Sequence, residues 1–436
     1  MKILIKKRYI DHAFNTKGKV FLIFYTALSI FALYYFTQYW SRNEFITMHN
    51  FSFLLSIPIF YSLFKMICSL FYRPCKKKVT KNLKVSVIIP NFNESVESVM
   101  KCIDCMLRQT YHVHEIIFVD DGSKDDSAYW HLLEFKKEIE TTNKYPKIKL
   151  VVHQFEKNKG KKAAQAWAFK NATGDVFMLV DSDGYISHNA VQEMIRNFEN
   201  DKVTSVCGHI NLRNVRYNFL TRMQDIIYEP SFQTGRASQS IFGNVLVCSG
   251  ALSMHRREVV INNLDEFLNS EVFGVVNEAG DDRLLTFLSQ KSGGKAVYQS
   301  TAICRTDGPT KLKKFFKQQV RWNKSALLYC TKSLKVAWRR PGLALMMILE
   351  TYLWLICTIT SFVLVMIFGI RVSFPTLIMT LQYYILVTYI NKIYYIFRSP
   401  IHFLLSPIYS LVYGTLLLCI RIHALLTIGK FSWGTR

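Results

Sequence analysis

Long apolar stretches alternate along the chain with one extended region of mixed pattern. Four stretches are each long enough to cross about 30 Å of hydrocarbon as a helix, namely 20–40, 51–72, 342–370 and 374–397. A fifth stretch, 401–429, contains Pro407, Arg421 and His423, which favour a helix in the membrane interface over a clean span. We therefore predict two hairpins of membrane-spanning helices. A signal peptide is the alternative for the first stretch, but its apolar run is too long and no small-residue cleavage site follows.

Between the two hairpins, from about residue 85 to 310, short β-branched runs alternate with amphipathic segments. The runs predict buried parallel strands at 85–89, 115–119, 149–152 and 177–180. The segments predict intervening helices at 95–108, 126–140, 160–172 and 188–199. This alternation is typical of an α/β nucleotide-binding domain. Because no G-x-G-x-x-G follows the first run and no G-x-x-x-x-G-K-[ST] occurs, dinucleotide and P-loop sites lose their main sequence support.

Basic residues cluster beside the apolar stretches. Half of the 436 residues are hydrophobic, and the formal net charge is +24. Nucleic-acid binding is one interpretation of this basicity, but its position favours the face of a bilayer. Lysines and arginines flank the first hairpin, while the loop inside it holds Arg42; the flanking residues are Lys2, Lys6, Lys7, Arg8, Lys17, Lys19, Arg73, Lys76, Lys77, Lys78, Lys81 and Lys84. The positive-inside rule then predicts a cytoplasmic N-terminus and a cytoplasmic domain after residue 73. The ten cysteines show no metal-ligand spacing and are expected to be reduced.

Polar side chains follow three of the predicted strands. They are Asn91, Asn93 and Glu94 after the first strand, Asp120 and Asp121 after the second, and Asp181 and Asp183 after the fourth. In an open α/β sheet, ligands bind beyond the carboxyl ends of the strands. The sequence therefore predicts one site at this edge of the sheet.

AspSerAsp at 181–183 places two carboxylates two residues apart. Mg²⁺ and Mn²⁺ prefer such oxygen ligands and share them with substrate phosphates, so a cation here would bridge a nucleotide diphosphate. The alternative is a loop in which the aspartates cap the next helix. GlyAspAspArg at 280–283 supplies a second pair. Asp282 is the candidate general base and Asp281 a supporting or acceptor contact, the alternative being a helix N-cap paired with Arg283.

The segment 311–336 is basic and amphipathic. One side of this predicted helix carries Gln318, Arg321 and Trp322. There a guanidinium could bind phosphate oxygens and an indole could stack on a sugar. Contacts with lipid headgroups are the alternative for these residues. Lys161, in AsnLysGlyLysLys, either reaches a nucleotide or lies on a solvated surface, and spacing does not decide between them. Cys248, in CysSerGlyAla, faces an acceptor or, as spacing alone favours, is a small buried residue.

Over nearly its whole length the chain resembles the bacterial hyaluronan synthases of the streptococcal type. The stretches that carry the resemblance are IleIleProAsnPheAsnGlu (88–94), AsnLysGlyLysLysAlaAlaGlnAlaTrpAlaPhe (158–169), ValAspSerAsp (180–183), AsnValLeuValCysSerGly (244–250), SerMetHisArgArgGluValVal (253–260), GlyAspAspArg (280–283), LysGlnGlnValArgTrpAsnLysSer (317–325), PheLeuLeuSerProIleTyr (403–409) and TrpGlyThrArg (433–436). The carboxylate and Q-x-x-R-W motifs are also shared with chitin and cellulose synthases. One departure is Ala251, where the family pattern has proline after CysSerGly.

The resemblance implies a GT-A type, Rossmann-like α/β domain and a role for each matching residue. It implies Asp282 as the general base, aided by Asp281, and a cation and diphosphate site at Asp183 with Asp181. The implied nucleotide-sugar contacts are Asn91, Glu94, Asp120, Asp121, Lys161, Gln318, Arg321 and, in a gating tail, Trp433 and Arg436. Cys248 and Trp322 would bind the acceptor. Such enzymes use UDP-N-acetylglucosamine and UDP-glucuronate alternately with Mg²⁺ or Mn²⁺ and extrude the polysaccharide through their own membrane channel.

The expected organisation follows from these patterns. It comprises a basic N-terminus (1–19), a hairpin of spans (20–72), a cytoplasmic glycosyltransferase domain (73–310), interfacial helices (311–341), a second hairpin (342–397), an interfacial or embedded helix (398–429) and a gating tail (430–436). The expected activity is processive, inverting sugar transfer at the cell membrane, with membrane lipids as partners and neither nucleic acid nor an obligate protein partner. The alternatives are a chitin-type synthase using one sugar, a non-processive transferase acting on a lipid phosphate, and an inactive membrane scaffold.

Overall fold

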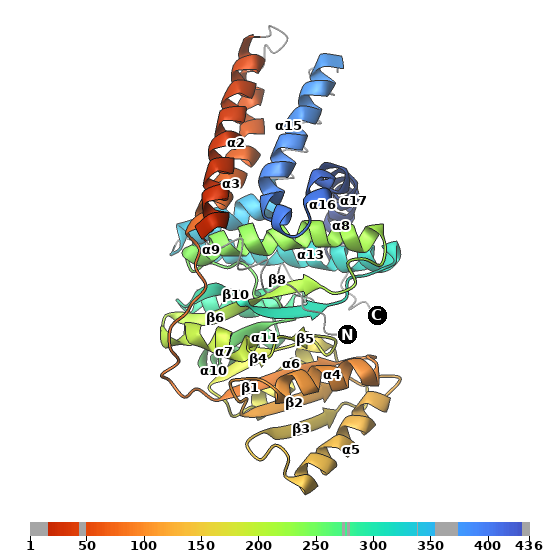
Figure 1. Ribbon diagram of the computed structural model, residues 1–436. Helices are drawn as coiled ribbons and strands as arrows, with labels where there is room; N and C mark the ends of the chain where they lie inside the picture. The colour runs from red at the N-terminus through yellow and green to blue at the C-terminus, as the bar shows by residue number, and fades with distance from the viewer. Residues whose placement is uncertain are drawn as a thin grey trace. The chain divides into compact units, whose positions relative to one another are not determined.

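The computed structural model describes residues 16–42, 49–272, 275–276, 280–337, 339–353 and 374–429. The chain divides into two compact units (Figure 1). Unit 1 comprises Met1–Arg73, Ile226–Ile241 and Ala337–Leu416, and unit 2 comprises Pro74–Asp225, Phe242–Val336 and Leu417–Arg436. The predicted gating residues Trp433 and Arg436 lie outside the described residues.

Unit 2 is built on an eight-stranded mixed sheet in the order β3-β2-β1-β4-β7-β6-β10-β5 (Figure 1). Its strands are β1 (Val85–Asn91), β2 (Glu115–Asp120), β3 (Lys149–Gln154), β4 (Val176–Leu179), β5 (Tyr185–Ile186), β6 (Val203–Leu212), β7 (Ser253–Arg256) and β10 (Lys295–Thr306). β1 pairs in parallel with β2 and β4, and β2 pairs in parallel with β3. All four strands predicted from the sequence are thus confirmed, as is the α/β class.

Helices cover both faces of this sheet. Alternate residues of a strand point to opposite faces, so a single strand can contribute to two hydrophobic clusters. Val87 and Ile89 of β1 pack in one hydrophobic cluster, whereas Ile88 packs in the other. The first cluster includes residues of α4 (Val96–Leu107), α5 (Ser127–Thr142) and α7 (Ala190–Ile195). The second includes residues of α6 (Lys161–Asn171), α10 (Arg257–Asn262), α11 (Leu264–Leu268) and α12 (Asp281–Lys291). The predicted helices at 95–108, 126–140 and 160–172 are α4, α5 and α6, and the one at 188–199 forms as α7 followed by the 3₁₀ turn η1 (Arg196–Glu199).

The other half of the sheet has no counterpart in the sequence prediction. β7 runs antiparallel to both β4 and β6, and β5 runs antiparallel to β10. A separate two-stranded sheet joins β8 (Glu271–Val272) to β9 (Val275–Val276). The antiparallel β7 separates two groups of parallel strands, so the sheet is mixed rather than purely parallel.

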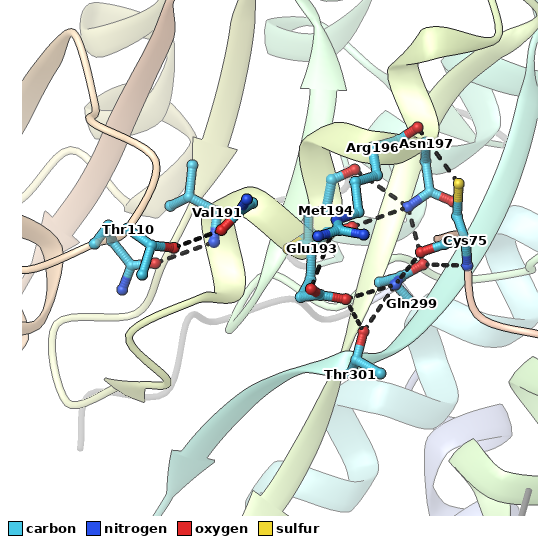
Figure 2. A network of polar contacts seen from close by, with 11 residues as sticks. Cys75, Thr110, Val191, Glu193, Met194, Arg196, Asn197, Gln299 and Thr301 are labelled. Carbon is cyan, nitrogen blue, oxygen red and sulfur yellow. Dashed lines mark hydrogen bonds and ion pairs between the residues drawn. The ribbon is translucent and has the colours of Figure 1, made fainter. Parts of the chain in front are cut away.

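A polar network connects the first residues of unit 2 to the rest of that unit (Figure 2). The Cys75 N–H donates to Gln299 Oε1 at 3.0 Å, and Gln299 Nε2 donates to the Cys75 carbonyl at 3.1 Å. Asn197 Nδ2 also donates to Gln299 Oε1, at 3.0 Å. The buried amide of Gln299 therefore pairs with the backbone of Cys75 as a neighbouring strand would, and it satisfies polar groups that would otherwise be buried without partners.

Unit 1 is helical. Its helices include α2 (Thr16–Arg42), α3 (His49–Phe71), Pro341–Leu353, α15 (Phe374–Lys392), η3 (Ile393–Phe397) and α16 (Pro400–Leu404), with α8 (Phe219–Pro230), η2 (Ser231–Arg236), α9 (Ala237–Ile241) and α17 (Ser406–Leu426) wholly or partly in it. Within the described ranges, one helix, Ser406–Leu426, is long and apolar enough to cross a bilayer. The polar residues of this segment favour a position in the membrane interface, and the four-span topology stays a prediction.

Candidate active site

The carboxyl ends of β1 and β2 bring Asn91 and Asp120 together. Asp120 is fully buried and accepts hydrogen bonds from Asn91 Nδ2 at 2.7 Å, Ser123 Oγ at 2.6 Å and Gln154 Nε2 at 3.2 Å. Because this carboxylate is surrounded by protein donors, it shapes the loop after β2 in addition to any contact it makes with a ligand. Glu94 lies partly buried in the loop that follows β1.

Asp121 holds the start of α6. Its two carboxylate oxygens accept the backbone N–H groups of Lys159 at 2.7 Å and Gly160 at 2.9 Å. Burial raises the pKa of Asp121 above its ordinary value, although these two hydrogen bonds oppose the shift. Gly122 has φ +65°, and a Cβ there would lie 2.5 Å from the Lys157 carbonyl carbon. Close packing of the loops after β2 and β3 therefore requires glycine at position 122. The position of the loop after β3 in turn sets that of Lys161, the residue that follows Gly160.

Lys161 lies between the two aspartate motifs. Its Nζ is 2.7 Å from Asp181 Oδ1 and 3.7 Å from Asp281 Oδ2, with 19% of its side-chain surface exposed. Burial alone would lower the pKa of Lys161, but the negative charges of Asp181 and Asp281 outweigh it and raise the pKa. Of the two interpretations of Lys161, the structure excludes a solvated surface position. Asp183 Oδ2 accepts a hydrogen bond from Thr306 Oγ1 at 3.3 Å.

Asp281 and Asp282 begin α12. Gln165 Nε2, on α6, donates to Asp281 Oδ2 at 2.7 Å, and the Arg283 N–H donates to Asp282 Oδ1 at 2.8 Å. Loss of water around the carboxylate, and then the neighbouring Asp281, raise the pKa of Asp282. A carboxylate with a raised pKa binds a proton more readily, as a general base must.

Gly280 sets α12 against α13 (Leu312–Ala337), the helix that carries the Q-x-x-R-W motif. Gly280 has φ +86°, and a Cβ there would lie 1.9 Å from Ser325 Oγ and 3.2 Å from Tyr329 Cε2. Ser325 follows Trp322 by three residues and Arg321 by four, so all three lie on neighbouring turns of α13. Gln318 and Arg321 are partly exposed, and 41% of Trp322 is exposed.

Cys248 has no exposed surface. Its N–H donates to Thr286 Oγ1 at 2.9 Å, and that hydroxyl donates to the Asp282 carbonyl at 2.7 Å. A Cβ on Gly250, two residues later, would lie 3.4 Å from Lys161 Nζ and 3.7 Å from Asp281 Oδ2. The turn after Cys248 thus borders the carboxylates through Gly250, while the thiol itself is buried.

The donor set of this site fits a divalent cation shared with a nucleotide. Within the described residues there is no group of three or more His, Cys, Asp or Glu side chains that would hold a metal by themselves. Mg²⁺ and Mn²⁺ are usually held by only one or two protein carboxylates, together with substrate phosphates and water. Asp181 and Asp183 match that number.

Three residues of the site were not identified from the sequence. Gln165 and Ser325 lie inside stretches that carry the family resemblance, but the motifs in these stretches indicate no role for either residue. Gln165 follows Lys161 by four residues, so helical periodicity places both on one face of α6. Thr286 follows Asp282 by four residues on α12, so the same spacing relates these two, but no sequence pattern predicts its contact with Cys248, which comes from a distant segment.

Comparisons with known proteins identify the family of this chain. Residues 86–264 match Glycosyl transferase family 2, and residues 176–429 match Glycosyl transferase family group 2. The hyaluronan synthase of Streptococcus pyogenes serotype M1 is 39% identical over 381 residues, covering 87% of this chain and 89% of that protein. An N-acetylglucosaminyltransferase of Azorhizobium caulinodans is 28% identical over 367 residues, covering 81% of this chain and 87% of that protein.

A solved structure shows the same fold. The mannosyltransferase from Pyrobaculum calidifontis, in complex with GDP-Man and Mn²⁺, superimposes with a TM-score of 0.58 and 16% identity, covering 85% of this chain and 94% of that chain. The sheet and its helices therefore form a GT-A type glycosyltransferase fold. With the identity to the streptococcal enzyme over most of both chains, this chain is a glycosyltransferase of family 2 and belongs to the hyaluronan synthases.

Proposed function

We propose that this glycosyltransferase builds hyaluronan processively, alternating N-acetylglucosamine from its UDP-sugar with glucuronate from UDP-glucuronate. The observation that carries the proposal is the convergence of AspSerAsp and GlyAspAspArg on Lys161, which brings a diphosphate-side carboxylate pair and a base-side pair into one site. The identity of the two sugars rests on the similarity to streptococcal hyaluronan synthase.

The proposed reaction is a single displacement with inversion at the anomeric carbon. Asp282 takes the proton from the attacking hydroxyl of the acceptor while that oxygen bonds to the anomeric carbon of the donor sugar. The bond from this carbon to the UDP oxygen breaks, and UDP leaves with the bonding electron pair. Asp181 and Asp183 would hold Mg²⁺ or Mn²⁺, which neutralises charge on the diphosphate. Gln165 keeps Asp281 in place beside the base through its 2.7 Å hydrogen bond.

The remaining assigned residues complete the proposed site. Arg321 and Gln318 on α13 would bind the diphosphate, since a guanidinium contacts two phosphate oxygens at once. Trp322 would stack on the acceptor sugar, and the exposure of 41% of its surface on the same helix supports this role. Cys248 would support the acceptor site through the turn that ends at Gly250. The nucleotide would be contacted by Asn91, Glu94, Asp120 and Asp121, and Trp433 and Arg436 would close over UDP from the tail.

The proposed location is the cell membrane, with the catalytic domain in the cytoplasm and the polymer extruded through the chain's own spans. Support comes from the basic residues around the first hairpin and from the apolar helix Ser406–Leu426.

A chitin-type synthase that uses one sugar is the second candidate. It is favoured by the 28% identity to the N-acetylglucosaminyltransferase of Azorhizobium caulinodans over 81% of this chain. Purified protein incubated with each UDP-sugar singly and with both together distinguishes the two functions. The proposal predicts polymer only with UDP-N-acetylglucosamine and UDP-glucuronate together. Sustained polymer from UDP-N-acetylglucosamine alone would establish the second candidate instead.

A further inference from the structure

The Lys161 ammonium contacts the carboxylate to which the proposed function assigns a divalent cation. Nζ lies 2.7 Å from Asp181 Oδ1, the distance of a charge-assisted hydrogen bond. A cation bound to that oxygen would use the same lone pairs and would repel the ammonium across a few ångströms of poorly solvated space. Lys161 and the cation are therefore competitors for Asp181.

A second carboxylate lies within reach of the same ammonium. Asp281 Oδ2 is 3.7 Å from Lys161 Nζ, and Asp281 is held there by the Gln165 amide at 2.7 Å. The lysine side chain is flexible enough to move between these two oxygens by rotation of its outer bonds. Asp281 precedes the candidate base Asp282, and its negative charge contributes to the raised pKa of Asp282. An ammonium at Asp281 would offset that charge.

We propose that Lys161 is a positioning residue that occupies Asp181 until a divalent cation displaces it to Asp281. When the cation binds Asp181, the ammonium of Lys161 moves to Asp281, beside the candidate base. Cation binding at AspSerAsp therefore changes the charge around GlyAspAspArg. The inference rests on the proposed function, because it requires Asp181 to be a cation ligand and Asp282 to be the base.

The first test is Mn²⁺ binding by the purified full-length chain without nucleotide, measured by the electron paramagnetic resonance signal of free Mn²⁺. Omitting UDP removes the contribution of any direct contact between Lys161 and the nucleotide. Lys161→Met and Lys161→Gln both lose the competing charge and should bind Mn²⁺ more tightly than the natural chain, by about tenfold. Lys161→Arg keeps a positive charge and should not show this gain.

Lys159 provides a matched control. It lies in the same loop, is exposed, and has its ammonium 4.7 Å from the centre of the Phe155 ring. Lys159→Met removes the same amount of charge without removing a contact to Asp181. Its Mn²⁺ affinity should stay within about twofold of the natural chain, since exposed charges are screened by solvent and salt. An equal gain in Lys159→Met and Lys161→Met would show a general charge effect and overturn the proposal.

A double-mutant cycle tests the movement to Asp281. Asp281→Asn removes the carboxylate that receives the displaced ammonium, so it should weaken Mn²⁺ binding by about threefold or more. The same substitution should have no such effect in the Lys161→Met background, where no ammonium needs a new partner. Equal effects in both backgrounds would overturn the exchange.

Failure of the inference is distinguishable from failure of the proposed cation site. Asp181→Asn and Asp183→Asn should weaken Mn²⁺ binding whether or not Lys161 is present. If they do so while both neutral Lys161 variants bind Mn²⁺ no more tightly than the natural chain, the competition is refuted and the cation site stands. If neither aspartate variant changes Mn²⁺ binding, the cation site itself is wrong, and the inference fails with it.

Discussion

Gly280→Ala tests whether the contact between α12 and α13 holds the base in place. The new methyl group would lie 1.9 Å from Ser325 Oγ and 2.9 Å from Ser325 Cβ, and the backbone would keep φ +86°. Holding an L-residue in a left-handed conformation costs about 1–2 kcal/mol. Overpacking adds about 1–3 kcal/mol, because either Ser325 or the start of α12 must move. The expected total is therefore about 2–5 kcal/mol.

A displacement of about 1 Å at the start of α12 would also move Asp281 and Asp282. Misplacement on that scale can reduce turnover about a hundredfold, so Gly280→Ala should lose most of its activity. UDP release from the purified chain measures turnover, and the thermal midpoint in detergent measures stability.

Two further variants separate the steric effect from the backbone effect. Gly293 has φ +85° but has no atom within 4 Å of its added Cβ, so Gly293→Ala shows the backbone strain alone. Ser325→Gly removes both atoms that clash, so it should restore part of the activity lost in Gly280→Ala. The argument is refuted if Gly280→Ala keeps the turnover of the natural chain, or if its loss of stability equals that of Gly293→Ala and Ser325→Gly restores nothing.

Four other predictions concern the base, the diphosphate and the tail. Asp282→Asn should reduce turnover about a hundredfold or more while UDP binding stays nearly intact, and near-normal turnover would place the base elsewhere. Because the folded-state pKa of Asp282 is raised, this residue contributes to the free energy of unfolding at acid pH, and the contribution is lost as pH rises through that pKa. Asp282→Asn should therefore melt at a higher temperature than the natural chain at pH 7, with the difference shrinking toward pH 4. An equal difference at both pH values would contradict this. Arg321→Lys should lose most UDP affinity because an ammonium lacks the planar fork, and full activity would make Arg321 a headgroup contact. Thr435→Cys should react with impermeant thiol reagents only from the cytoplasmic side, and labelling from outside would overturn the predicted four-span topology.

The sequence alone determined the first half of the sheet and the edge at which the site lies. β1, β2 and β4 are buried on both faces, so their residues form continuous β-branched and apolar runs that a local pattern can identify. Their carboxyl ends meet at one edge in any parallel sheet, and this is why Asn91 and Asp120 were expected to lie together. Both conclusions depend only on neighbouring residues and on a general rule of sheets.

The tertiary structure decided how distant segments meet. Nothing in the spacing of AspSerAsp and GlyAspAspArg brings Asp181 and Asp281 within 4 Å of the ammonium of one lysine. That arrangement needs α6 and α12 packed on the same face of the sheet. The antiparallel placement of β7 between β4 and β6 is likewise a matter of pairing, which burial patterns do not encode.

The segment 401–429 also shows what the sequence determines and what only the tertiary structure decides. From the sequence alone, placing Arg421 and His423 in hydrocarbon is energetically unfavourable, but a charge pattern does not identify the partners of these side chains. In the structure, Arg421 Nε donates to Asn323 Oδ1 at 3.3 Å, and the His423 ring lies 5.6 Å from the Phe316 ring. Both partners belong to α13, so the polar end of α17 rests on the helix that carries Arg321 and Trp322. Local hydropathy determines where an apolar helix forms, whereas only the packed chain determines which polar groups satisfy its end.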